Sequence, residues 1–165
     1  MKYSVVYSSR TGNTKLLADT IMQEIPKNNC IYFGPIDDRA LEADRIFVGF
    51  WTDNGVCNEE TAAFLKKIGK KDVFLFGTAG LGRSVNYFDK IIHRTRALMS
   101  EKSRFIGSFM CQGKMPMALR ERYMEMKKAP VPDPNLDRMI ENFDIALSHP
   151  SKEDLFNLRS WMRKL

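Results

Sequence analysis

Side chains able to bind an anion are concentrated in one polar stretch near the start of the chain: Ser8, Ser9, Arg10, Thr11, Gly12, Asn13 and Thr14. The run Tyr3–Tyr7 before it favours a β-strand, because Tyr and Val suit strands. Residues 16–25 after it have apolar side chains at helical spacing, and Pro26 ends that helix. A loop between a strand and a helix start directs backbone N–H groups and the helix dipole to one point, which suits an anion.

The residues of this loop leave two interpretations open. In the first, the hydroxyls and the Asn13 amide bind a phosphate-like anion, and Gly12 lets the backbone approach it closely. In the second, the loop is an ordinary strand-to-helix turn, with Thr11 or Asn13 as the helix N-cap. The number of donors favours the anion site. The stretch has neither the Gly-Lys-Ser/Thr ending of a Walker loop nor the G-x-G-x-x-G pattern of dinucleotide-binding loops.

Size and composition restrict the class of protein. With 165 residues, of which 44% are hydrophobic, the chain is expected to form one domain, 1–165, with one core. No apolar run is long enough to span a bilayer, and the N-terminus lacks a signal-peptide pattern, so no membrane association is expected. Cys30, Cys57 and Cys111 show no C-x-x-C spacing, which argues against an iron–sulfur site and favours a reducing cytoplasm. The two histidines are isolated, so no metal site is expected.

The net charge of +6 and the isoelectric point near 9.3 favour anionic partners, such as acidic proteins, phosphate esters or nucleic acid. Basic residues are interspersed with acidic residues instead of forming one block, which argues against nucleic acid as a partner.

The remaining pattern predicts an α/β fold. Apolar runs that read as strands occur at 3–7, 30–33, 45–50, 73–76 and 104–110, and most are separated by helical segments. This alternation predicts a five-stranded parallel sheet with helices on both faces, and we choose the strand order 2-1-3-4-5. Because ligands bind beyond the carboxyl ends of such strands, we expect the loops at 9–14, 51–57 and 77–82 to lie together.

The last third of the chain reads as further helices. Residues 115–127 have helical spacing, and a Pro-rich connector at 129–134 separates them from a second apolar helix face between Leu136 and Leu147. Ser151 and Asp154 occupy the positions of a capping box at the start of a last helix. The prediction is therefore a helical tail over about 115–165.

The stretch Ser9–Thr14, directly after an N-terminal strand, resembles the phosphate loop of the flavodoxin family, which binds the phosphate of flavin mononucleotide (FMN). The resemblance implies a flavodoxin-like three-layer sandwich, bound FMN and electron transfer. It covers the chain to about Met110 and the tail poorly. Arg10 departs from the family pattern, and its expected role is either pairing with phosphate or pointing to water.

The resemblance also implies two further walls for the flavin, and the expected contacts are Trp51, Thr52, Asp53, Asn54 and Gly55 from one loop and Gly77, Thr78, Ala79, Gly80 and Leu81 from the other. Trp51 follows a buried strand, where it can stack on the ring; the alternative is a core or rim tryptophan. Leu81 stands where the family often has a stacking Tyr, so one ring face is covered by Leu81 or left open. Arg83 follows directly, and its charge is expected to favour the anionic reduced ring.

The expected function is an FMN-binding electron carrier that passes electrons to a partner reductase with an acidic docking surface. Phe76–Gly80 and Ser148–Ser151 extend the resemblance to flavodoxin-like proteins associated with bilirubin reduction in gut bacteria. Two alternatives stay open. One is an FMN-dependent NAD(P)H oxidoreductase or quinone reductase, and the other is a flavin-free interaction module.

Overall fold

The computed structural model describes residues 1–82 and 84–165, and within them alternating strands and helices run the length of the chain. The strands are β1 (Tyr3–Tyr7), β2 (Cys30–Pro35), β3 (Arg45–Asp53), β4 (Val56–Cys57), β5 (Asp72–Ala79) and β6 (Arg104–Gln112). The helices are α1 (Asn13–Glu24), α2 (Glu59–Lys67), α3 (Val85–Arg96), α4 (Met117–Met126), α5 (Leu136–Ala146) and α6 (Lys152–Met162), with short 3₁₀ turns at Lys27–Asn29 and Asp38–Glu42.

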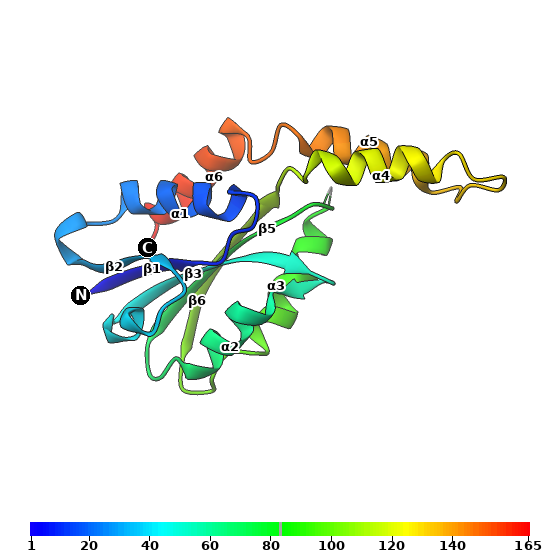
Figure 1. Cartoon of the computed structure of the whole chain (residues 1–165). Coiled ribbons are helices and arrows are strands. Elements are labelled where there is room, and N and C mark those ends of the chain that lie inside the picture. The colour runs from blue at the N-terminus through cyan, green and yellow to red at the C-terminus, as the bar shows by residue number, and fades with distance from the viewer. Residues whose placement is uncertain (83) are drawn as a thin grey trace.

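The parallel strands of the described chain lie in the order β2-β1-β3-β5-β6, and the short β4 pairs antiparallel with the end of β3. When β4 is left out and the five parallel strands are numbered in chain order, this order becomes 2-1-3-4-5, so the predicted strand order is confirmed. Helices α1 and α6 cover one face of the sheet and α2 and α3 the other, giving three layers (Figure 1). Each face has its own apolar cluster, and the central strands β3 and β5 are buried on both.

The central strands pack through glycine and phenylalanine pairs. Gly49 of β3 lies opposite Phe76 of β5, and Phe50 lies opposite Gly77. In each pair the ring occupies the space where a Cβ on the glycine would stand. The glycines therefore allow large buried rings to lie flat against the neighbouring strand, which a residue with a side chain would prevent.

Parts of two segments that were predicted as loops belong to β-strands. Trp51–Asp53 extends β3, and a tight turn at Asn54 and Gly55, with φ of 50° and 81°, leads directly into β4. Two consecutive positive φ angles suit a two-residue hairpin, so only Asn54 and Gly55 form a turn and the loop predicted over the whole of 51–57 is wrong. Gly77–Ala79 likewise continues β5, because its register with β6 runs on to Ala79 and Gln112.

The helices after β6 divide into two groups. Helices α4 and α5 form an antiparallel hairpin that projects beyond the carboxyl ends of the strands (Figure 1), joined by ion pairs between Arg120 and Asp144 and between Lys127 and Asp137, each at 2.8 Å. Helix α6 returns to the sheet and buries Leu158 beside α1. The capping box predicted at Ser151 and Asp154 is present.

The glycine–phenylalanine pairs predict a large difference between two glycines. A Gly49→Ala substitution forces a methyl group into the ring of Phe76 and is expected to lower the free energy of unfolding by about 1–3 kcal/mol. The matched control is Gly69→Ala, because no heavy atom lies within 4 Å of its added Cβ. Urea denaturation measures both, and equal midpoints for the two variants would contradict this packing account.

Candidate functional site

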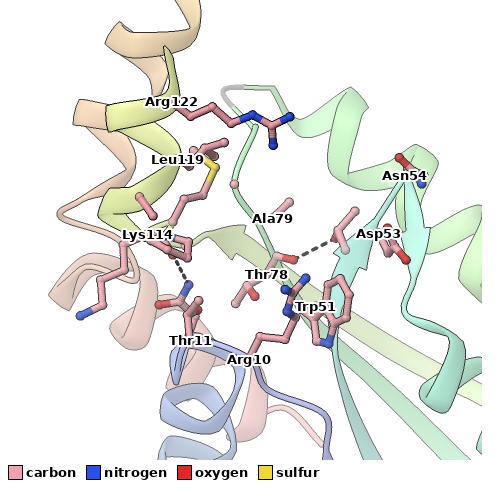
Figure 2. Close-up of a pocket in the computed structure, with 17 residues that line it drawn as sticks. Arg10, Thr11, Trp51, Asp53, Asn54, Thr78, Ala79, Lys114, Leu119 and Arg122 are labelled. Atoms are coloured by element: carbon pink, nitrogen blue, oxygen red, sulfur yellow. Dashed lines mark hydrogen bonds between the residues drawn. The ribbon is translucent and has the colours of Figure 1, made fainter. Parts of the chain in front are cut away.

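A cavity of about 940 Å³ lies beyond the carboxyl ends of the strands, and Figure 2 shows it between the loop before α1, the end of β3, and α4. Its lining combines the predicted site with residues from the start of the helical tail. The residues are Arg10, Thr11, Asn13, Trp51, Thr52, Asp53, Asn54, Thr78, Ala79, Gly80, Gly113, Lys114, Met115, Pro116, Ala118, Leu119 and Arg122.

The loop before α1 presents backbone donors to this cavity. The N-cap of α1 is Gly12, at φ 87°, which has no side chain to accept a hydrogen bond from a backbone N–H. Neither Thr11 nor Asn13, the two residues that the sequence suggested, is the N-cap. The Lys15 N–H donates to Ser9 Oγ at 3.3 Å. Within residues 1–82 and 84–165, the N–H groups of Asn13 and Thr14 have no acceptor. Free N–H groups at the start of a helix, beside the exposed Thr11, have the chemistry that suits an anion.

Two other side chains expected as donors instead hold the loop in place. Asn13 Nδ2 donates to the Lys114 carbonyl at 2.8 Å. The buried Thr14 hydroxyl lies 3.2 Å from both the Phe50 carbonyl, to which it donates, and Thr78 Oγ1. Asn13 and Thr14 therefore fix α1 against β3, β5 and the segment after β6.

The Ser8 hydroxyl is also part of the scaffold. It donates to Glu60 at 2.9 Å and accepts from Asn58 Nδ2 at 2.9 Å. Asn58 stands at the N-cap position of α2, but its Oδ1 accepts from the Thr61 hydroxyl and not from a backbone N–H. The Asn58 side chain thus ties the first turn of α2 to the loop before α1.

Trp51 forms one wall of the cavity. Its indole is partly buried, and the guanidinium of Arg10 lies over the ring, 4.8 Å from the centroid (Figure 2). The neighbouring Thr52 hydroxyl donates to the Thr78 carbonyl at 2.9 Å, which fixes β3 to β5 at the cavity floor. Asp53 and Asn54 complete this rim.

The predicted third wall is only partly in place. Thr78, Ala79 and Gly80 line the cavity, whereas Gly77 lies within β5 under the Phe50 ring. Gly55 is outside the lining, with its carbonyl accepting from Arg94 at 3.3 Å, and Leu81 is 55% exposed and also outside it. Arg83, the expected charge beside the ring, lies outside the described residues.

Helix α4 and the segment before it supply the wall that the sequence did not predict. Met115, Leu119 and Arg122 face the cavity, and Arg122 extends from α4 over it (Figure 2). The Met115 side chain packs directly on Gly80, where an added Cβ would lie 2.5 Å from the sulfur. The available signal was the spacing of these three residues, four and then three apart, which is typical of side chains on one side of a helix.

Hydrogen bonds attach the helical hairpin to the rim of the cavity. Gln112 Nε2 donates to the Gly80 carbonyl at 2.9 Å and to Asn142 Oδ1 at 3.0 Å. Asn142 Nδ2 donates to the same carbonyl at 3.1 Å. The Lys114 N–H donates to the His149 carbonyl at 2.9 Å. Helix α5 and the segment before α6 thus hold α4 above the sheet.

The cavity is rich in positive charge. Arg10, Lys114 and Arg122 line it together with the carboxylate of Asp53. Burial, with a smaller effect from the Asp154 carboxylate, raises the pKa of the Cys111 thiol well above its usual range, so Cys111 is a buried structural residue and not a nucleophile. No cluster of three or more His, Cys, Asp or Glu side chains suited to a metal occurs among the described residues. The arrangement suits a flat ligand that carries an anionic group.

Comparison with known proteins identifies the family. The sequence matches the flavodoxin domain family over residues 4–163. The chain belongs to the flavodoxin family. It is 38% identical over 172 residues to the flavodoxin-like domain-containing protein BilS of Clostridium symbiosum, covering 94% of this chain and 90% of that protein. It is 31% identical over 169 residues to BilS of Clostridioides difficile, covering 100% and 96%.

A solved structure agrees with this assignment at the level of the fold. The flavoprotein of Lactobacillus acidophilus NCFM, solved in complex with FMN, superposes with a TM-score of 0.50 and 17% identity, covering 66% of this chain and 92% of that one. The flavodoxin-like fold expected from the sequence is therefore confirmed. The family match runs through α6, so it includes the helical tail that the sequence resemblance covered poorly. Among the described residues, no helix has the length and apolar character needed to cross a membrane.

Proposed function

We propose that this flavodoxin-family chain binds FMN in the cavity and acts as an electron carrier. The observation that carries the proposal is that Thr11 and Asn13, at the start of α1, line the same cavity as Trp51. An anion site beside a flat aromatic wall matches the two ends of FMN, its phosphate and its ring. FMN, when bound, supplies the capacity to accept and release electrons.

The residues present fit this cofactor. Thr11 and the first N–H groups of α1 would hold the phosphate, and Trp51 would flank the ring. Met115, just before α4, and Leu119 of α4 supply apolar surface, which limits the access of water to the cavity. The FMN complex of the Lactobacillus flavoprotein, which shares the fold, supports the same choice of cofactor.

The proposed partner is a reductase with an acidic docking surface. The cationic side chains of Arg10, Lys114 and Arg122 lie around the cavity, and the whole chain has a net charge of +6. Opposite charges on a partner would steer it to this opening. The resemblance to flavodoxin-like proteins associated with bilirubin reduction suggests that the partner acts in that process. Three free thiols, Cys30, Cys57 and Cys111, favour the cytoplasm as the compartment.

A charge placed in the loop tests the phosphate site. Thr11→Glu sets a carboxylate against the phosphate and is expected to weaken FMN binding by about tenfold or more, because the repulsion reaches roughly 1–4 kcal/mol at 4 Å. Binding of riboflavin, which lacks the phosphate, should change far less. Thr11→Gln is the control of similar size without the charge. Isothermal titration gives the affinities, and equal losses for FMN and riboflavin would place the phosphate elsewhere.

Reduction kinetics separate a carrier from a self-contained enzyme. The FMN-loaded protein alone is expected to sustain no oxidation of NADH or NADPH with a quinone as acceptor. Electron transfer from the chemically reduced protein to an acidic partner reductase should slow as salt rises, because ions screen the attraction. Stopped-flow absorbance measures both rates. Sustained NAD(P)H turnover by the isolated protein would instead identify it as an FMN-dependent oxidoreductase.

A further inference from the structure

Arg10 occupies the face of Trp51 that a stacked ring needs. Its guanidinium lies 4.8 Å from the indole centroid, and both residues line the same cavity (Figure 2). Arg10 is exposed, and no carboxylate in residues 1–82 and 84–165 forms an ion pair with it. The indole of Trp51 is therefore the partner of the Arg10 guanidinium, and their contact requires that no other ring lies on that face of the indole.

We propose that Arg10 is a specificity-determining residue, which covers Trp51 in the ligand-free protein and moves to the ligand phosphate when a flavin ring stacks on the indole. The inference rests on the proposed function, because it takes the cavity as a flavin site. It assigns Arg10 two contacts, of which the first is lost and the second gained on binding.

The first contact opposes the binding of any ring on this face. An arginine over an indole is stabilised by attraction between its charge and the negative face of the ring, worth about 0.5–2 kcal/mol. A ring that stacks on Trp51 must displace the guanidinium and lose that energy. The contact between Arg10 and Trp51 therefore weakens the binding of every flavin by the same amount, whether or not the flavin carries a phosphate.

The second contact is available only to a phosphorylated ligand. Arg10 lies in the loop that ends at the N-cap Gly12, next to Thr11 and close to the free N–H groups of α1. A guanidinium binds phosphate through two parallel hydrogen bonds, so the displaced side chain gains a strong partner there. Arg122 lines the same cavity, and repulsion from its guanidinium disfavours other positions for Arg10 inside it (Figure 2). Riboflavin offers no such partner.

The test uses Arg10→Gln in a Trp161→Phe background, which leaves Trp51 as the single tryptophan of the two in the chain. Removing the guanidinium from the face of Trp51 should tighten riboflavin binding by about two- to thirty-fold. Removing the guanidinium from the phosphate should lower the ratio of FMN affinity to riboflavin affinity by about tenfold or more. In the ligand-free protein, acrylamide should quench Trp51 fluorescence more strongly in the variant than in the parent.

Arg96→Gln is the matched control. Arg96 lies over the Phe105 ring at 4.4 Å from the centroid and outside the cavity lining, so the same substitution removes the same kind of contact elsewhere. It should leave both affinities and the quenching unchanged.

The proposal requires all three changes for Arg10→Gln and none for Arg96→Gln, and any other combination contradicts it. An unchanged affinity ratio, for example, would mean that the displaced guanidinium pairs with Asp53 instead of phosphate. If the parent binds FMN and the Arg10→Gln variant has the same affinities and the same quenching, the role proposed for Arg10 is wrong, while the proposed function stands. A parent that binds neither flavin overturns the proposed function together with this inference.

Discussion

The hydrogen bond from Asn13 to the Lys114 carbonyl, 2.8 Å long and spanning 101 positions of the chain, joins the two parts of the site. One end belongs to the first turn of α1 and the other to the segment that leads into α4. Asn13 is only 7% exposed, and Gly113 lies so close that an added Cβ would stand 2.5 Å from the amide nitrogen. The glycine is required for this contact, and the contact sets where α4 begins relative to the loop before α1.

A second set of bonds holds α4 over the sheet. The Gly80 carbonyl accepts from both Gln112 and Asn142, so the end of β5, the end of β6 and α5 meet at one partly buried acceptor. Helix α4 itself buries no residue. Its position therefore depends on its neighbours, and its inner side chains face the cavity instead of a packed core. The loop before α1 and Trp51 form one side of the cavity, and the helical hairpin contributes the opposite wall.

Local sequence patterns were sufficient for the parts of the site that depend on neighbouring residues. The strand, polar loop and helix start around Gly12, and the position of Trp51 at a strand end, follow from residue types within a few positions. The β3 extension past Phe50 was missed because its pairing with β5 and the hairpin turn stabilise a strand whose sequence has already become polar.

Long-range contacts account for the remaining differences. Asn13 and Thr14 have the composition of ligand donors, yet distant partners at Lys114 and Phe50 use their side chains. Arg10 could not be placed because its partner, Trp51, lies 41 positions away by residue number. Helix α4 has an uneven apolar pattern with no buried face, so periodicity alone gave no reason to bring it over the cavity.

Amide hydrogen exchange with and without FMN tests most directly whether the cavity between the loop, Trp51 and α4 is the cofactor site. Binding there should slow exchange in residues 12–16 and also in α4, while β2, an edge strand outside the cavity lining, serves as the unchanged reference. Slower exchange in both α4 and the loop is the predicted result. Slower exchange in the loop with no change in α4 would contradict the role of the helical hairpin as a wall of the site.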